Sequence, residues 1–375
     1  MMMQSPFLLA DQTLFKNFDA FELDYIPDQV LFREEQISEL AFRVRPGIFG
    51  ARPASAICRG PPGTGKTTTV KHLFAEIAES QKRLVPIYVN CQTDHTRYAV
   101  FSRIYRQVVG HAPPRTGVAA TVLSDAIAAS IIKQKIVVLV CLDDFQYLLP
   151  EDTANAVLYS LLRMYLNHSD CRVGVILTTS EMTLDLSRVL ESGVASSLCA
   201  DDISFPRYTP DEIREILRIR VREAVWPGVI SNEVLDLIVW KTHKAGDLRV
   251  GLDLLKRAVL QAERNARSSV VREDILLAYG DARLITLKKT IRLLPPGERA
   301  LLDLIADTGG GDPLTSGELY NRLTDDEEIS YTTFYERLKR LAEYGLVNLR
   351  IRQKKGRTSV ITPRYEAEEI QAVSE

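Results

Sequence analysis

Residues 60–67 read Gly-Pro-Pro-Gly-Thr-Gly-Lys-Thr and fit the pattern G-x-x-x-x-G-K-[ST]. The glycines let successive backbone amides face one anion, and the positive end of the following helix faces it too. Residues 54–58 resemble the end of a buried strand and residues 67–78 a helix, as this pattern requires. The alternative is a glycine-rich turn with a surface lysine. We predict a phosphate-binding loop whose contacts are Pro61, Pro62, Gly63, Thr64, Gly65, Lys66, Thr67 and Thr68.

Two acids follow the most apolar stretch of the chain. Residues 136–142 are seven apolar residues in a row, typical of a central parallel strand buried on both faces, and Asp143 and Asp144 come next. The carboxyl end of such a strand is where Mg²⁺ and the attacking water are held beside a phosphate-binding loop. We expect Asp143 and Thr67 to bind Mg²⁺ and Asp144 to act as general base. The alternative is a pair of acids that only ends the strand in solvent.

A further strand, residues 172–180, ends in hydroxyl side chains. The polar residue near a γ-phosphate is expected at such a strand end, and Ser180 is the first candidate, with Thr179 the second. The order of strands and helices up to this point predicts a doubly wound α/β nucleotide domain.

The chain becomes helical after residue 205. Thr209 precedes proline and acids, which is typical of a helix N-terminus, and later helices are predicted to begin near residues 231 and 250. A last short helix is predicted over 271–278. Arg249 follows a Gly-Asp turn at the start of the third helix, where it could reach nucleotide phosphates; the alternative is a solvent-facing arginine. We predict three domains, at residues 1–205, 206–284 and 285–375.

The last domain has the pattern of a winged helix-turn-helix, three helices followed by a β-hairpin. Residues 287–364 hold 14 Lys/Arg against 11 Asp/Glu, and residues 350–364 hold six basic residues and no acid. Such a local positive charge favours DNA binding, although a winged helix used for protein contacts is the alternative. The expected DNA contacts lie in the third helix and the wing and are Tyr331, Thr332, Thr333, Tyr335, Arg337, Lys354, Lys355 and Arg357.

The whole chain sets wider limits. Its formal net charge is −2, so a nucleic-acid surface must be local. The five cysteines have no metal-ligand spacing, which suits buried thiols in a reducing compartment. No apolar run reaches the length of a membrane span, and the N-terminus has no signal-peptide pattern. We expect a cytoplasmic, nucleoid-associated protein with no membrane partner.

These features together resemble the archaeal replication-initiator family, which is related to the eukaryotic origin-recognition subunits and the cell-division-cycle helicase loader. The motifs that carry the resemblance run nearly the full length: GPPGTGKT, LDD, Val194–Leu198 as VASSL, residues 203–209 as ISFPRYT, and GDLR at 246–249. The resemblance implies an AAA+ ATPase module with a helical lid, ATP or ADP with Mg²⁺, double-stranded origin DNA, the MCM replicative helicase and other initiator subunits. It also implies an adenine site at Tyr25, Ile26, Pro27 and Tyr208, although residues 1–50 could be an arm that only packs.

The family further contacts DNA through a helical insertion in its ATPase domain. The corresponding segment here is residues 93–117, with Arg97, Arg103, Arg106 and Arg115.

Three departures from the family pattern affect catalysis. Asp144 stands where a glutamate is usual, and Ser180 stands where a sensor asparagine is usual. Gly193 and Ser197 occupy places where a basic residue is often found, and Arg188, which lies nearby, could substitute for it. Because an arginine at the γ-phosphate is worth orders of magnitude in rate, we expect a slow ATPase in which ATP acts as a conformational latch. A turnover as high as that of fast motor ATPases would contradict this.

Two other functions fit the same parts. The first is an ATP-gated DNA-binding regulator of transcription or of plasmid or transposon maintenance. The second is a protein-interaction ATPase of the clamp-loader type, which would bind DNA weakly. Sequence preference on DNA separates an initiator from a regulator.

Overall fold

The computed structural model describes residues 13–80, 82–113, 118–308, 314–324, 329–353, 357–365, 367 and 369–370. The chain divides into two compact units, Met1–Ile275 and Leu276–Glu375. The predicted domain boundary at residue 205 falls inside the first unit, and the one at residue 284 falls inside the second. Both domain boundaries stay predictions. Among the described residues, no helix combines the length and apolarity needed to cross a membrane.

A five-stranded parallel sheet is the centre of the first unit. Its strand order is β2-β3-β4-β1-β5. The carboxyl ends of all five strands meet at one edge, because parallel strands share a direction. The strands are β1 (Ala56–Arg59), β2 (Leu84–Asn90), β3 (Val137–Asp143), β4 (Val173–Thr179) and β5 (Asp201–Ser204).

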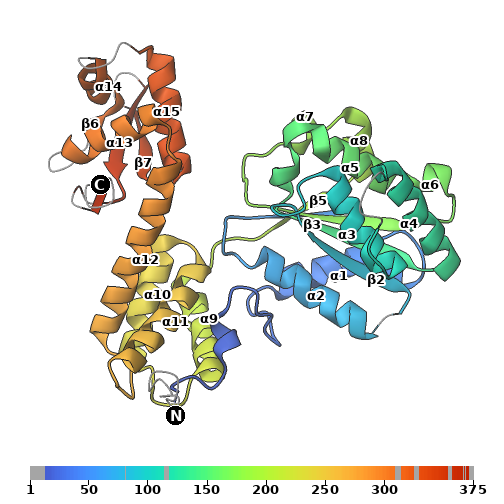
Figure 1. Ribbon diagram of the computed structural model, residues 1–375, viewed down its shortest axis with the longest axis horizontal. Helices are drawn as coiled ribbons and strands as arrows, with labels where there is room; N and C mark the ends of the chain where they lie inside the picture. The colour runs from blue at the N-terminus through green and yellow to red at the C-terminus, as the bar shows by residue number, and fades with distance from the viewer. Residues whose placement is uncertain are drawn as a thin grey trace, which may run out of the picture. The chain divides into compact units, whose positions relative to one another are not determined.

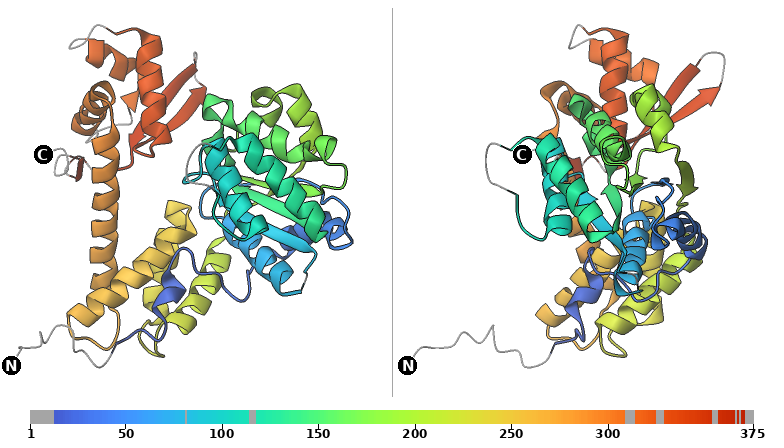
Figure 2. Two further views of the ribbon diagram at one scale, coloured as in Figure 1. Left: turned by 45° about the vertical axis from the view of Figure 1, so that its right-hand side comes forward. Right: turned by 90° about the vertical axis from the view of Figure 1, so that its right-hand side faces the viewer.

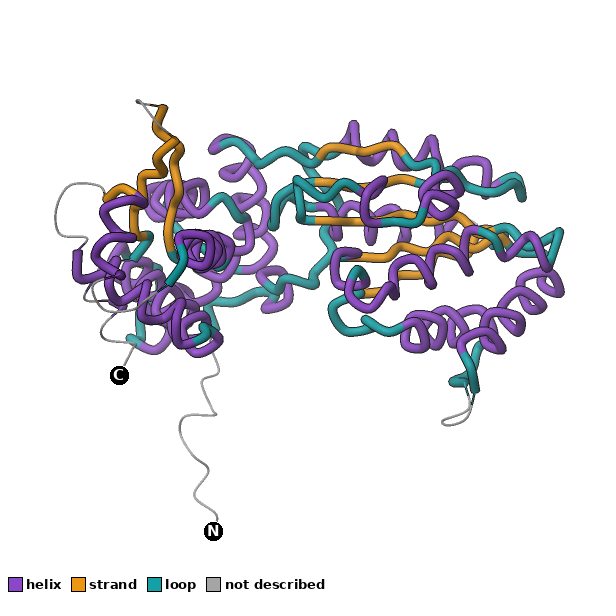
Figure 3. The backbone as a smooth tube through the Cα atoms, turned by 90° about the horizontal axis from the view of Figure 1, so that it is seen from above, coloured by secondary structure: helices purple, strands orange, loops and turns teal. Residues whose placement is uncertain are grey.

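Helices cover both faces of this sheet, as the apolar run of residues 136–142 predicted (Figures 1 and 3). On one face, Val138, Val140 and Leu142 of β3 belong to a core with residues of α3, α4 and α5. On the other face, the alternate β3 residues belong to a core with residues of α1 and α2. The fold is therefore a doubly wound α/β domain. The helices are α1 (Glu34–Ile48), α2 (Lys66–Ser80), α3 (Arg97–Val109), α4 (Ala120–Gln134), α5 (Thr153–Leu162), α6 (Met164–Asn167), α7 (Leu186–Val189) and α8 (Ser192–Leu198), with the 3₁₀ turns η3 (Phe145–Leu148) and η4 (Pro150–Asp152).

The helical part begins after β5 with α9 (Pro210–Ala224), α10 (Asn232–Ala245) and α11 (Leu248–Arg264). Their starts follow the sequence: Thr209 and Glu212 form a capping box, and Ser231 and Asp247 cap the next two helices through their side-chain oxygens.

The helix α12 (Arg272–Leu293) corrects the short helix predicted over 271–278. Between residue 278 and Pro295, Gly280 is the weakest helix former, and one interior glycine costs about 1 kcal/mol. That is too little to end a helix, so α12 runs on to the Pro295-Pro296 break. The boundary between the two compact units falls inside it.

The N-terminal segment packs on the helices that follow the sheet. Phe15 forms an isolated antiparallel bridge with Val225, and the amides of Lys16 and Asn17 donate to the Ala224 carbonyl at 2.7 and 3.0 Å. The short η2 (Phe18–Phe21) follows, with Phe21 buried. The segment then runs toward α1, which places residues 23–31 over the carboxyl edge of the sheet.

In its described residues, the second unit contains the C-terminal part of α12, three further helices and a small antiparallel sheet of order β6-β8-β7. Apolar residues of the three helices and of β8 share one core, centred on Leu301, Leu319, Phe334 and Ile361. Figure 2 shows the β7–β8 hairpin beside α15. This is the predicted winged-helix arrangement of three helices followed by a hairpin. The elements are α13 (Pro296–Thr308), β6 (Leu314–Thr315), α14 (Ser316–Thr324), α15 (Tyr331–Glu343), β7 (Val347–Gln353) and β8 (Arg357–Pro363).

Candidate nucleotide site and nucleic-acid face

The loop between β1 and α2 has the backbone that its sequence predicts. Gly63 and Gly65 have φ of 71° and 88°, the left-handed region that favours glycine. A Cβ on Gly63 would lie 1.9 Å from an Asp247 carboxylate oxygen, and one on Gly65 would lie 2.6 Å from the Tyr208 hydroxyl. Both glycines are therefore required by conformation and by the close approach of the neighbouring segments.

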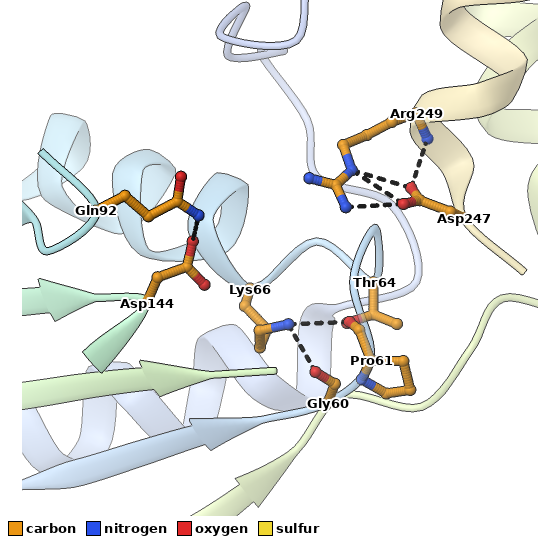
Figure 4. Close-up of polar contacts among 8 residues, drawn as sticks. All are labelled: Gly60, Pro61, Thr64, Lys66, Gln92, Asp144, Asp247 and Arg249. Atoms are coloured by element: carbon orange, nitrogen blue, oxygen red, sulfur yellow. Dashed lines mark hydrogen bonds and ion pairs between the residues drawn. The ribbon is translucent and has the colours of Figure 1, made fainter. Parts of the chain in front are cut away.

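Lys66 is buried and folds back on its own loop. Its Nζ donates to the carbonyls of Gly60 and Pro61 at 2.7 and 2.9 Å (Figure 4). Burial lowers the pKa of the Lys66 ammonium, and Asp144 and Asp143 oppose this shift. A buried cation bound only by carbonyl dipoles is suited to an incoming anion, so the loop fits a nucleotide phosphate.

Asp143 ends β3 with its carboxylate almost fully buried among hydroxyl groups. Thr178 and Tyr88 donate to its two oxygens at 2.6 and 2.7 Å, and the Thr67 hydroxyl lies 2.9 and 3.0 Å from them. A carboxylate beside a hydroxyl is the hard oxygen donor set that Mg²⁺ prefers, so Asp143 and Thr67 fit the predicted metal role.

Asp144 lies at the turn after β3, in the left-handed conformation with φ of 53°. Its amide donates to Thr178 Oγ1 at 2.9 Å. Its carboxylate accepts from Gln92 Nε2 at 2.8 Å and from Gln146 Nε2 at 3.3 Å (Figure 4). These contacts hold the carboxylate at the pocket wall.

The two hydroxyl candidates after β4 differ in placement. Ser180 lines the pocket, whereas Thr179 is buried and its Oγ1 accepts the Glu181 amide at 3.2 Å. Ser180 is therefore the candidate that faces the pocket, and its role beside a phosphate stays a prediction.

Arg249 comes from the first turn of α11 and also lines the pocket. Its guanidinium pairs with Asp247, with Nε and Nη2 at 3.0 and 2.7 Å from the carboxylate oxygens. This hydrogen bonding raises the pKa of Arg249. Figure 4 shows the pair on the helical part beside the loop that carries Thr64.

Arg33 is a site residue to which sequence reasoning assigned no role. It is 2% exposed, and its guanidinium donates to the carbonyls of Thr64 at 2.9 Å, Pro206 at 2.7 Å and Phe32 at 2.6 Å. It also lies 3.9 Å from the Tyr208 ring centroid. Burial lowers the pKa of Arg33. One buried cation thus joins the phosphate-binding loop to the segment that leads into α9.

The predicted nucleotide residues surround one pocket of about 540 Å³. The Arg220 guanidinium lies over the ring of Tyr25, 4.5 Å from the centroid of that ring. Pro61 is not in the lining, although its carbonyl accepts from Lys66 and Thr64. The lining includes Tyr25, Ile26, Pro27, Pro62, Gly63, Thr64, Gly65, Lys66, Thr67, Thr68, Asp143, Asp144, Ser180, Tyr208 and Arg249.

In the second unit, the start of α15 presents an aromatic face. Tyr331 and Tyr335 are 47% and 38% exposed, and their rings stack at 6.3 Å between centroids. Thr332 and Thr333 are exposed beside them, and Ser330 caps the helix.

The basic candidates of this unit are placed differently. The Arg337 guanidinium packs close to Gly297 of α13, because a Cβ added to that glycine would lie 2.4 Å from it. Around the axis of α15, Arg337 therefore lies on one side of the buried residues, and Tyr331 and Tyr335 lie on the other. Arg357 begins β8, and Lys354 and Lys355 lie outside the described residues.

Three arginines of the predicted insertion, Arg97, Arg103 and Arg106, lie in α3. Arg97 donates to Ser160 at 2.9 Å, and Arg103 pairs with Asp94 at 3.0 Å. Arg106 is exposed, and Arg115 lies outside the described residues.

Gly193 and Ser197 of α8 have a basic neighbour that the sequence did not indicate. Arg163 donates to the Gly193 carbonyl at 2.8 Å and to Ser197 Oγ at 3.1 Å. Arg188, the predicted substitute, is exposed and pairs with Asp185 at 3.0 Å.

The sequence is similar to family models and to several known proteins. The family model for a Cdc6 AAA+ ATPase-type lid domain matches residues 214–280, and one for an AAA domain matches residues 51–185. The chain is 41% identical to the ORC1-type DNA replication protein 2 of Methanosarcina mazei, over 97% of this chain and 96% of that protein. It is 38% identical to the ORC1-type DNA replication protein 6 of Halobacterium salinarum, over 92% and 91%.

Two solved structures are similar over nearly the whole chain. The Aeropyrum pernix ORC1 protein in complex with DNA has a TM-score of 0.74 at 26% identity and covers 97% of both chains. The ORC2 protein of the same organism, in ADPNP–ADP complexes, has a TM-score of 0.74 at 25% identity, over 96% of this chain and 98% of that one.

Proposed function

Since the chain belongs to the family of ORC1-type DNA replication proteins, we propose that it is a replication initiator that binds ATP and double-stranded origin DNA. The proposal rests on the similarity of nearly the whole chain to ORC1-type DNA replication proteins. The phosphate-binding loop, the two acids after β3 and Arg249 all line one pocket, which agrees with it. We further propose that it helps place the MCM helicase on origin DNA, alone or with other initiator subunits, in the cytoplasm at the nucleoid.

ATP or ADP would be held by the loop amides and by Lys66, which would exchange its two carbonyl partners for phosphate oxygens. Tyr25, Ile26, Pro27 and Tyr208 would enclose the adenine end of the pocket. Bound Mg²⁺, held by Thr67 and Asp143, would supply charge neutralisation of the phosphates. These are proposals from position and donor chemistry.

Hydrolysis of ATP would be slow because of the residues that surround the terminal phosphate. Asp144 would accept the proton of the attacking water, with Ser180 beside the terminal phosphate and Arg249 contributing positive charge. The Asp144 carboxylate is one methylene shorter than glutamate and already accepts from Gln92 at 2.8 Å. Because this carboxylate reaches less far than glutamate and is already held by Gln92, it would be poorly placed to take a proton from the attacking water, so ATP would serve mainly as a latch.

Origin DNA would be read by the face at the start of α15. Tyr331, Thr332, Thr333 and Tyr335 would enter the major groove, while Arg337, Lys354, Lys355 and Arg357 would supply charge toward phosphates. The placement of Arg337 against Gly297 makes it the weakest of these candidates.

The double variant Tyr331→Ala/Tyr335→Ala is expected to weaken binding to origin DNA about tenfold, because each tyrosine would lose a contact worth about 0.5–1.5 kcal/mol and about 1.4 kcal/mol corresponds to tenfold. Fluorescence anisotropy with a labelled duplex at fixed salt measures this. Tyr344→Ala is the matched control, since Tyr344 is 49% exposed at the opposite end of α15. Equal affinities for the double variant and the wild type would contradict the assignment of this face.

A further inference from the structure

The hydroxyl of Tyr88 in β2 reaches the end of the neighbouring strand β3. Tyr88 lies beside Cys141 in the β2–β3 register, and its OH donates to Asp143 Oδ2 at 2.7 Å. A phenol carries its proton at neutral pH and an ionised carboxylate can only accept, so Tyr88 is the donor in this hydrogen bond. The Lys71 ammonium lies 4.7 Å from the ring centroid, which fixes the ring from the side of the pocket.

The two oxygens of Asp143 have different permanent donors. Thr178 Oγ1 accepts the Asp144 amide at 2.9 Å, which leaves its proton for Asp143 Oδ1 at 2.6 Å. Tyr88 provides the donor at Oδ2, at 2.7 Å, from a residue that is not itself a proposed metal ligand. The remaining neighbour, Thr67, is itself a proposed metal ligand, so its oxygen would face the cation.

Rotation of a carboxylate about its last side-chain bond meets little intrinsic resistance. With one donor on each oxygen, the plane of the Asp143 carboxylate is fixed before any cation arrives. Mg²⁺ demands near-ideal octahedral geometry, so a ligand that is already oriented binds it better than one that rotates.

We propose that Tyr88 is a positioning residue that orients Asp143 for Mg²⁺, an inference that rests on the proposed Mg²⁺–nucleotide site. Loss of an outer partner of a metal ligand typically costs 10–100-fold in metal affinity. Tyr88→Phe removes one oxygen atom and keeps the ring and its contact with Lys71.

The test measures binding of a fluorescent ATP analogue to the full chain, first with EDTA and then over a titration of MgCl₂. For Tyr88→Phe, the Mg²⁺ concentration at half-maximal effect is expected to rise about tenfold, while the affinity in EDTA stays within about twofold of wild type. Tyr105→Phe is the matched control, because Tyr105 packs against the core of the same unit outside the pocket. Asp143→Asn is the reference variant for the metal site.

Each outcome decides a different claim. If Asp143→Asn raises the Mg²⁺ requirement and Tyr88→Phe does not, the role of Tyr88 is wrong and the metal site stands. If neither variant changes it, the proposed metal site is wrong as well. If Tyr88→Phe weakens binding equally in EDTA, Tyr88 shapes the pocket and does not position Asp143. Thermal unfolding of each variant confirms that the fold is kept.

Discussion

Replacing Arg33 with methionine is expected to lower the free energy of unfolding of the first unit by about 3 kcal/mol, because each buried polar group left unsatisfied costs about 1–3 kcal/mol. The variant removes the donors from the Thr64 and Pro206 carbonyls, and from Phe32 as well. Methionine fills similar volume, so the loss comes chiefly from these hydrogen bonds. The nucleotide affinity should fall too, since Thr64 and the Tyr208 ring then lose their common anchor.

Urea unfolding followed by tryptophan fluorescence measures this effect in the full chain. Both tryptophans, Trp226 and Trp240, lie in the first unit, so their signal reports that unit. Arg33→Lys keeps a charged donor and should be intermediate. The control Arg45→Met, at an exposed position of the same helix α1, should change stability by less than about 0.5 kcal/mol. Identical unfolding of Arg33→Met and Arg45→Met would show that the three hydrogen bonds contribute nothing.

The second large effect is expected for Lys66→Met, which should weaken binding of ATP and of ADP at least about 100-fold. Hydrogen bonds to charged groups contribute about 1.5–3 kcal/mol each, and about 2.8 kcal/mol corresponds to 100-fold. The stability of the nucleotide-free protein should fall by less than in Arg33→Met, because Lys66 donates to two carbonyls and burial already disfavours its ammonium there.

Isothermal titration calorimetry gives the two affinities, and thermal unfolding gives the stability. Lys133→Met is the matched control, because Lys133 is exposed in the last turn of α4, outside the pocket. A Lys66→Met protein that binds ATP as tightly as wild type would mean that the loop does not hold phosphate.

The sequence predicted what depends on local pattern. Apolar runs located β3 and β4, so the positions of Asp143 and Ser180 at strand ends followed directly. Capping residues located the starts of α9, α10 and α11. These features need only neighbours within a few residues of one another in the chain.

The missed residues depend on contacts between distant segments. Arg33 bonds Thr64 and Pro206, which are 31 and 173 positions away in the chain. Tyr88 and Thr178 meet at Asp143 only because β2 and β4 flank β3, and a single sequence does not state strand order. A hydroxyl near the carboxyl end of each flanking strand is the signal that could have identified both.

The central claim, that this protein marks a replication origin, is tested most directly by binding to DNA fragments that span the genome of its source organism. Wild type and Tyr331→Ala/Tyr335→Ala are compared in ATP and in ADP. The account predicts a few high-affinity sites clustered in one intergenic region, dependent on the nucleotide and lost in the variant. Sites scattered at promoters would identify a regulator instead, and uniform weak binding that ignores the variant would contradict DNA recognition by α15 altogether.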